Sequence, residues 1–157
     1  MKQKRAIRIL TPARPLRAGT KEVVELSLKL PKSVHLVSYV ASFEGRCRSS
    51  FSGQDSQHTL IDEKLYIPFG AIQLPNTNII PDGMHRLPIF LAVPLTLPGT
   101  FTGKSGAIAY RFVVKMKIKR TNSTSDEGII ECEKAVDVLG RVSLDQHPAF
   151  AQPVSID

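Results

Sequence analysis

Positively charged side chains gather in two stretches of the sequence that contain no acidic residue. The first stretch spans residues 1–21 and the second spans residues 111–120. They account for much of the formal net charge of +7. Clustered Lys and Arg side chains attract anions, such as phosphorylated peptides, phospholipid headgroups or nucleic acid. The chemistry that this sequence offers most clearly is therefore anion recognition.

Residues for catalysis or metal binding do not form a familiar motif. None of the four histidines lies four residues from another, and there is no phosphate-binding glycine loop or nucleophile elbow. Cys47 and Cys132 form no C-x-x-C pair, so we expect free thiols buried on strands and no metal site. His85 is interpreted as a partly buried structural residue at the start of a strand. We predict a protein that is not an enzyme and needs no cofactor.

The aromatic residues disfavour nucleic acid as the anionic partner. Proteins that bind single strands stack bases on exposed aromatic rings, but only 6% of the residues here are aromatic and none is Trp. Tyr110 and Phe112 alternate with the basic residues of the second stretch, so rings and charges point to opposite faces.

Alternation of apolar and polar residues predicts the elements that carry these charges. A period of two runs through most of the chain, and turn-forming residues separate the runs. Residues 108–120 form the longest run, with Ile108 to Ile118 on the apolar parity and Lys115, Lys117 and Lys119 pointing outward. The strands are expected at 7–10, 22–30, 34–49, 85–95, 108–120 and 128–142, with 59–72 ambiguous. Seven or eight such strands predict a β-sandwich or barrel.

Residues 81–120 resemble the N-domain hallmark of arrestins, especially the arrestin-related α-arrestins. The matching positions are Gly83, His85, Pro88, Pro94, Leu97, Pro98, Phe101, Gly103, Gly106, Ile108 and Tyr110. Residues 16–30 and 37–51 resemble two earlier strands of the same domain. The sequence departs from the family at Gly99 and Thr100, where arrestins have two serines, and at Ala109, where they have Arg.

This resemblance implies an all-β fold, an immunoglobulin-like arrestin β-sandwich of two antiparallel sheets. It would span residues 1–140, and residues 141–157 would be an exit strand or linker towards a C-terminal arrestin domain outside this chain. Phe101 is expected to plug the loop 97–106 against the core, and the glycines of that loop to adopt positive φ.

The resemblance also implies a non-catalytic adaptor that recognises cytosolic tails of membrane receptors or transporters. It would couple this cargo to ubiquitination, endocytosis or endosomal sorting, in the cytoplasm and at the periphery of the plasma membrane or endosomes. A ubiquitin ligase would bind through regions outside this chain, because no P-P-x-Y motif is present. By this resemblance, the residues that meet cargo or phosphate are Lys2, Lys4, Arg5, Arg8 and Arg14.

A phosphorylated tail could also pair as an added strand along the first strand. Lys115, Lys117 and Lys119 are the predicted secondary basic face, with a solvated strand face as the alternative interpretation. Two other functions remain open at this point: a retromer-type arrestin-fold sorting subunit, and a basic β-domain that binds anionic lipid.

Overall fold

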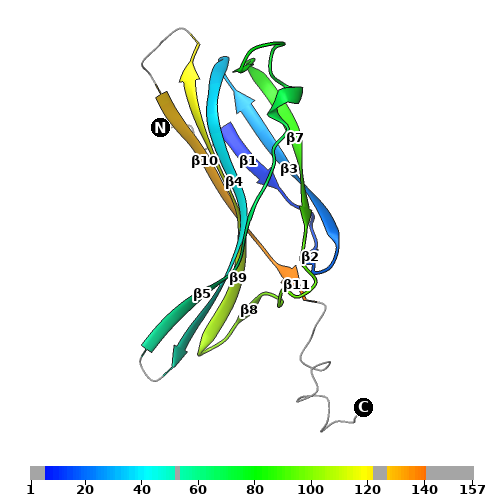
Figure 1. Cartoon of the computed structure of the whole chain (residues 1–157), viewed down its shortest axis with the longest axis vertical. Helices are drawn as coiled ribbons and strands as arrows, with labels where there is room; N and C mark the ends of the chain where they lie inside the picture. Colours follow the sequence, from blue (N-terminus) through cyan, green and yellow to red (C-terminus); the bar gives the residue numbers. More distant parts are fainter. Residues whose placement is uncertain (1–5, 52–53, 122–126, 141–157) are drawn as a thin grey trace.

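The computed structural model describes residues 6–51, 54–121 and 127–140. These residues form strands, joined by loops and by the short 3-10 turn η2 (Phe69–Ala71) (Figure 1). No helix in the described part of the chain is long and apolar enough to cross a membrane. The strands are β1 (Ile7–Leu10), β2 (Leu16–Arg17), β3 (Lys21–Leu30), β4 (Val34–Phe51), β5 (Gln54–Lys64), β6 (Ile79–Ile80), β7 (Gly83–Ala92), β8 (Phe101–Thr102), β9 (Gly106–Arg120), β10 (Glu127–Val136) and β11 (Val138–Leu139).

Two antiparallel sheets make up the sandwich. The small sheet has the strand order β1-β3-β7, and the large sheet has the order β10-β9-β4-β5. The short strands β6 and β8 pair with β4 and β9, and β2 pairs with β11 in parallel. The prediction of an all-β sandwich with two antiparallel sheets is confirmed. Residues 141–157, predicted as an exit strand or linker, lie outside the described residues.

The core follows the alternation in the sequence. On β9, every second residue from Tyr110 to Ile118 is buried between the sheets. The apolar parities of β3 and β7 meet them from the small sheet, and β7, which contains Pro88, lies at the edge of that sheet, where a strand proline is tolerated. Burying one large apolar side chain stabilises a fold by about 1.5–3 kcal/mol. The same alternation of period two therefore determines which side chains fill the interior and which point outward.

A register shift between Leu36 and Ser38 changes the pattern expected for β4. In the sequence, Val37 shares one parity with Tyr39, Ala41 and Phe43, and strict alternation would bury all four; in the structure Val37 is exposed and Leu36 is buried instead. A bulge adds one residue to one strand of a pair, so the side chains on its two sides change parity. In the ambiguous region, β5 ends at Lys64 and η2 follows.

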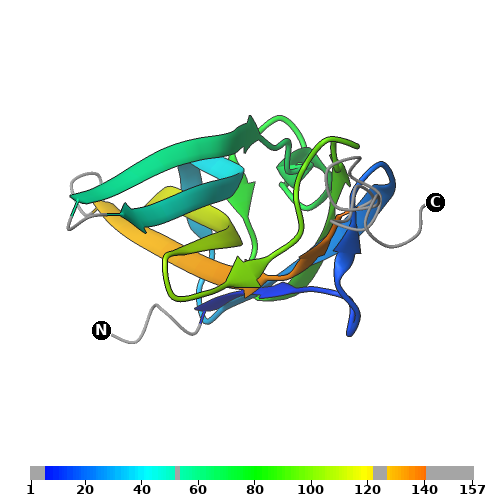
Figure 2. The same cartoon turned by 90° about the horizontal axis from the view of Figure 1, so that it is seen from below.

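The large sheet curls and extends beyond the small one. Residues 45–51 of β4, together with β5 and the start of β9, project past the small sheet towards the lower left of Figure 1. Figure 2, which views the molecule from below, also shows β10 beside β1. The outer edge of β1 is thus covered by β10, which argues against adding a peptide strand at that edge.

The contacts that hold the loop between β7 and β9 differ from those predicted from the sequence. Phe101 is 56% exposed and does not plug the core, whereas Leu97 is buried. Gly99, Gly103 and Gly106 do not have positive φ. Gly106 is needed instead for close approach, because a Cβ there would lie 2.7 Å from the Arg48 carbonyl oxygen.

Tyr110 anchors this loop to the large sheet. Its hydroxyl donates a hydrogen bond to the Pro98 carbonyl over 2.5 Å, and its ring stacks on Phe43 with centroids 5.7 Å apart. The ring also covers the backbone of Gly45 on the neighbouring strand β4. Burial raises the pKa of the Tyr110 phenol to about 12. Tyr110 therefore has a structural role in this chain.

Candidate functional site

The predicted secondary basic face points outward from the large sheet, but its charges are paired. The Lys117 ammonium lies 3.3 Å from a Glu127 carboxylate oxygen, and Lys119 lies 4.0 Å from the same carboxylate. Lys115 lies 4.0 Å from Glu131. The antiparallel register sets these pairs because it places β10 acids opposite β9 lysines. The lysines are therefore matched with carboxylates on their own sheet.

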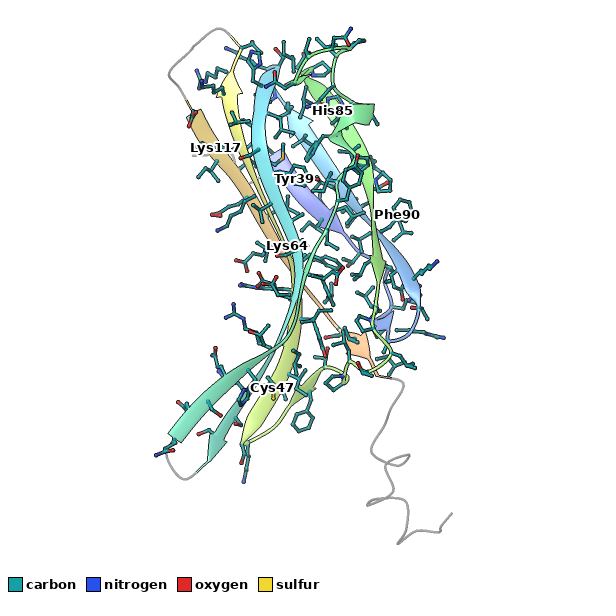
Figure 3. The ribbon with its side chains drawn as sticks, viewed as in Figure 1. Tyr39, Cys47, Lys64, His85, Phe90 and Lys117 are labelled. Atoms are coloured by element: carbon teal, nitrogen blue, oxygen red, sulfur yellow. The ribbon has the colours of Figure 1, made fainter. Side chains whose placement is uncertain are left out.

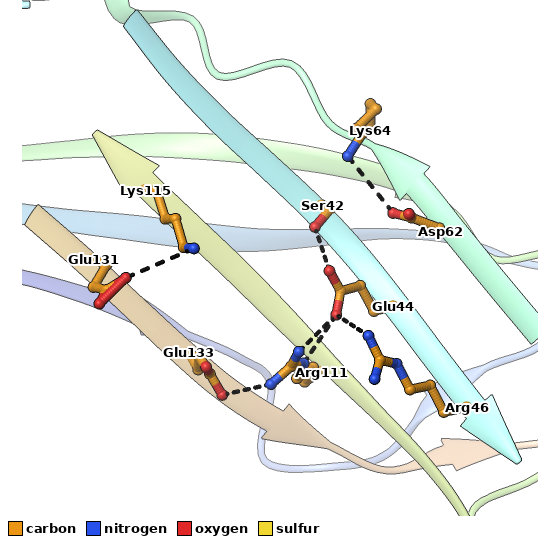
Figure 4. Close-up of polar contacts among 9 residues, drawn as sticks. All are labelled: Ser42, Glu44, Arg46, Asp62, Lys64, Arg111, Lys115, Glu131 and Glu133. Atoms are coloured by element: carbon orange, nitrogen blue, oxygen red, sulfur yellow. Dashed lines mark hydrogen bonds and ion pairs between the residues drawn. The ribbon is translucent and has the colours of Figure 1, made fainter. Parts of the chain in front are cut away.

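The same pairing continues towards the centre of the large sheet, as Figure 4 shows. Arg111 contacts the Glu44 and Glu133 carboxylates, each at 2.9 Å, and the Ser42 hydroxyl donates to Glu44. Burial disfavours the charged form of Glu44, but the hydrogen bonds from Arg111 and Ser42 outweigh it and lower its pKa. Arg46 and Lys64 also lie within 4.0 Å of acidic partners. We call this surface the large-sheet face; six of its cations are matched by five acids.

The outer surface of the small sheet has a different composition, and we call it the small-sheet face. Its outward-pointing side chains are Arg8, Leu10, Lys21, Val23, Glu25, Ser27, Lys29, Met84, Arg86, Pro88, Phe90 and Ala92. Four of these residues are basic and one, Glu25, is acidic. Glu25 lies 3.4 Å from Arg86. Arg8, Lys21 and Lys29 form no ion pair with another described residue.

Exposed apolar side chains lie among these cations. Phe90 is 68% exposed and stands directly opposite Val23 on the neighbouring strand. In Figure 3 the Phe90 ring points away from the sandwich. Met84 is also exposed and lies opposite Lys29. Apolar side chains next to unpaired cations form a surface that can bind an anion and an apolar group together.

The sequence-predicted cluster is divided by the fold. Arg8 lies on the small-sheet face, in the same cross-strand row as Ser27 and Arg86. Arg14 precedes β2 and contacts Glu22, which is on the inward parity of β3. Five residues of strand separate Ser27 from Glu22, or about 16 Å at 3.3 Å per residue. Lys2, Lys4 and Arg5 lie outside the described residues.

Arg14 is engaged in a structural ion pair. Its guanidinium donates to both carboxylate oxygens of Glu22, at 2.9 and 3.1 Å, and to the Pro15 carbonyl at 3.0 Å. Glu22 also accepts bonds from the Arg17 backbone N–H and the Thr20 hydroxyl. The hydrogen bond from Arg14 is the main reason that the pKa of Glu22 falls to about 2, against the opposing effect of burial. These bonds use three of the five guanidinium N–H groups.

The remaining candidate residues for chemistry are dispersed. His85 is half-buried at the start of β7, and its Nε2 lies 2.8 Å from the Pro81 carbonyl, in keeping with a structural role. Cys47 and Cys132 are free and half-buried, rather than buried as expected. Burial raises the pKa of the Cys132 thiol. Within the described ranges, no three His, Cys, Asp or Glu side chains gather as a metal site requires.

Lys21, Lys29, Arg86 and Phe90 were not predicted as site residues. A signal for them is present in the sequence, because each alternates with the aliphatic residues that predict the core, Val24 to Leu30 in β3 and Leu87 to Leu91 in β7. Alternation alone does not show that β3 and β7 are neighbours, so their side chains could not be assigned to one surface.

No protein-family model and no curated protein matches the chain. Among solved structures, it is similar to Spo0M, a sporulation control protein from Bacillus subtilis. The two share 14% identity with a TM-score of 0.45, over 87% of this chain and 50% of Spo0M. A second similar structure is AvmM, described as catalysing macrocyclization in alchivemycin A biosynthesis. It has 9% identity and a TM-score of 0.39, over 86% of this chain and 88% of AvmM. The chain thus spans half the length of Spo0M, and at these TM-scores neither similarity bears on function.

Proposed function

We propose that this chain is a non-catalytic, arrestin-type adaptor domain. It binds cytosolic segments of membrane receptors or transporters and couples them to ubiquitination, endocytosis or endosomal sorting. A ubiquitin ligase would be recruited through regions outside this chain, and the domain would work in the cytoplasm beside the plasma membrane or endosomes. The resemblance of residues 81–120 to arrestins supports the class of function. The unpaired charge of the small-sheet face supports the place where cargo binds.

The main support for this proposal is that the cations of the two outer faces differ in whether they have acidic partners. On the large-sheet face, Lys115, Lys117 and Lys119 already have carboxylate partners. On the small-sheet face, Arg8, Lys21 and Lys29 have none among the described residues. An approaching anion therefore meets unpaired cations on the small-sheet face, whereas Lys115, Lys117 and Lys119 are already paired with carboxylates. Charge-assisted hydrogen bonds to phosphate or carboxylate are stronger than neutral ones, and Arg can make them in pairs.

The expected ligand is an acidic or phosphorylated segment that also carries apolar side chains. Its anionic groups would contact Arg8, Lys21 and Lys29, and its apolar groups would pack against Val23, Met84 and Phe90. Binding across the face is favoured over strand addition. β10 covers the edge of β1, and Pro88 removes a backbone donor from the opposite edge, β7.

Anionic lipid is a second candidate ligand for this face. The exposed Phe90 ring beside Val23 favours it, because apolar side chains flanked by Lys and Arg can enter a negatively charged membrane surface. A lipid surface and a peptide differ in the selectivity that they produce. A membrane would be bound according to its charge, while a cargo site would distinguish between peptides of equal charge.

Binding to an array of cytosolic-tail peptides, each with and without phosphate, tests the proposal. Vesicles of phosphatidylcholine with or without phosphatidylserine are measured in parallel at two salt concentrations. The triple variant Arg8→Gln, Lys21→Gln, Lys29→Gln should bind its preferred peptide at least tenfold more weakly. The matched variant Lys115→Gln, Lys117→Gln, Lys119→Gln should change binding less than twofold.

Selective, salt-tolerant peptide binding that only the first variant loses would support the cargo function. Binding to anionic vesicles without any peptide preference would replace it with the lipid function. Equal losses in both triple variants would contradict the assignment to the small-sheet face.

A further inference from the structure

An apolar cleft opens at the end of the sandwich where β3 ends and β4 begins. These strand ends lie at the top of Figure 1. Its volume is about 240 Å³. Leu30 and Val34 line it from the ends of β3 and β4, and Ile118 and Ile130 line it from β9 and β10. These four side chains are buried, so the cleft continues from the hydrophobic core.

Two cations, Lys32 and Arg120, line the same cleft. Strand alternation places them there. Arg120 follows Met116 and Ile118 on the inward parity of β9, and Lys32 follows Leu30 two residues later in the turn. The inward-pointing rows of side chains thus change from apolar to basic where the core meets solvent.

Among the described residues, no acid matches the positive charge of the cleft. None of its described lining residues is Asp or Glu. Neither Lys32 nor Arg120 forms an ion pair with another residue in the described part of the chain. This differs from the large-sheet face, where Lys117 and Lys119 both contact Glu127. An apolar cavity with cations at its rim complements a ligand that has an apolar tail and one anionic end.

We propose that this cleft binds the carboxylate form of a medium-chain fatty acid. The tail would lie against Leu30, Val34, Ile118 and Ile130, and the carboxylate would meet Lys32 and Arg120. The volume is below the roughly 300–1,000 Å³ of pockets for drug-sized ligands, which favours a short, unbranched tail. The site does not depend on the proposed cargo function, because none of these residues belongs to the small-sheet face.

Isothermal titration of the full chain with saturated fatty acids from hexanoate to palmitate tests this site. Affinity should rise about fourfold for each added methylene while the tail still enters the cleft, since one buried CH₂ contributes about 0.8 kcal/mol. It should then reach a plateau at a medium length. Decanol, which has the same tail as decanoate but no charge, should bind at least tenfold more weakly.

Two double variants separate recognition of the carboxylate from general charge effects. Lys32→Gln with Arg120→Gln should weaken decanoate binding at least tenfold and leave decanol binding unchanged. Arg48→Gln with Lys104→Gln removes one Arg and one Lys at the opposite end of the large sheet and should change neither affinity. All four side chains are exposed, so both variants should fold.

Methyl NMR spectra place the ligand independently of affinity. Decanoate should shift the Ile118 and Ile130 methyl signals to saturation at one ligand per chain, and should leave Ile89 in the small sheet unchanged. Equal binding of decanol and decanoate, absence of saturable binding, or shifts confined to residues outside the cleft would each overturn the proposal. Shifts at Ile118 and Ile130 that follow protein concentration without ligand would instead indicate that a second copy of the chain occupies the cleft, and would also overturn it.

Discussion

Replacing Glu22 by Gln removes one negative charge from the inward side of β3 while preserving the shape of the side chain. In the native protein the Glu22 carboxylate accepts hydrogen bonds from Arg14, Arg17 and Thr20. The Glu22 side chain is only 4% exposed, whereas that of Arg14 is 52% exposed. The variant therefore leaves a guanidinium, half in solvent, without its charged partner.

The size of the effect follows from the pKa of Glu22. One pKa unit is worth about 1.4 kcal/mol, so a fall from 4.5 to about 2 corresponds to about 3.5 kcal/mol at most. Solvent around the exposed guanidinium screens part of this interaction. We therefore expect Glu22→Gln to lower the free energy of unfolding by about 2 kcal/mol at pH 7.

The sign of the pH dependence is fixed by the direction of the shift. Because the folded state has the lower pKa, the carboxylate stabilises the fold fully above the unfolded value of 4.5. This stabilisation is lost as the pH falls from about 4.5 towards about 2. The difference between native protein and variant should therefore be largest at neutral pH and shrink through this window.

Urea unfolding followed by circular dichroism, at pH 7 and at several values down to pH 2.5, measures this difference. Glu25→Gln is the matched control, since Glu25 lies on the same strand but forms an exposed pair with Arg86. That variant should change stability by less than about 0.5 kcal/mol. Equal stability of Glu22→Gln and native protein at pH 7, or a difference that does not shrink in acid, would refute the reasoning.

Two further predictions concern the packing of Tyr110. Gly45→Ala places a Cβ in contact with the Tyr110 ring and should lower the unfolding free energy by about 1–3 kcal/mol, whereas Gly70→Ala, which meets nothing within 4 Å, should be close to neutral in the same thermal melts. Tyr110→Phe removes the hydrogen bond to Pro98 and should cost about 1 kcal/mol. In an absorbance titration, native protein should show one tyrosine with a pKa near 12 that Tyr110→Phe lacks; an unchanged titration curve would contradict the burial of this phenol.

The motif positions within residues 97–110 have a structural role in this chain. Leu97, Pro98 and Tyr110 hold the loop between β7 and β9 against the large sheet, and Gly106 allows a close backbone approach. These residues therefore stabilise the fold, and none of these contacts forms a ligand-binding site. The functional assignment therefore depends on the outer faces of the two sheets.

The sequence by itself determined the fold class and the interior of this protein. Alternation with a period of two fixes which side chains can share one face of a strand, and apolar residues on one parity must be buried. That local rule was sufficient for β3, β7 and β9. It failed at Val37, because a bulge depends on the pairing of β4 with its neighbour.

Only the tertiary structure decided which charges are available to a partner. Arg14 precedes Glu22 by eight residues, and Lys117 precedes Glu127 by ten, yet each pair is in contact through the turn or strand register between them. Arg8 and Lys29 come from different strands but share the small-sheet face. Whether a charged side chain is paired depends on its neighbours in space. Strand alternation specifies only the direction in which each side chain points.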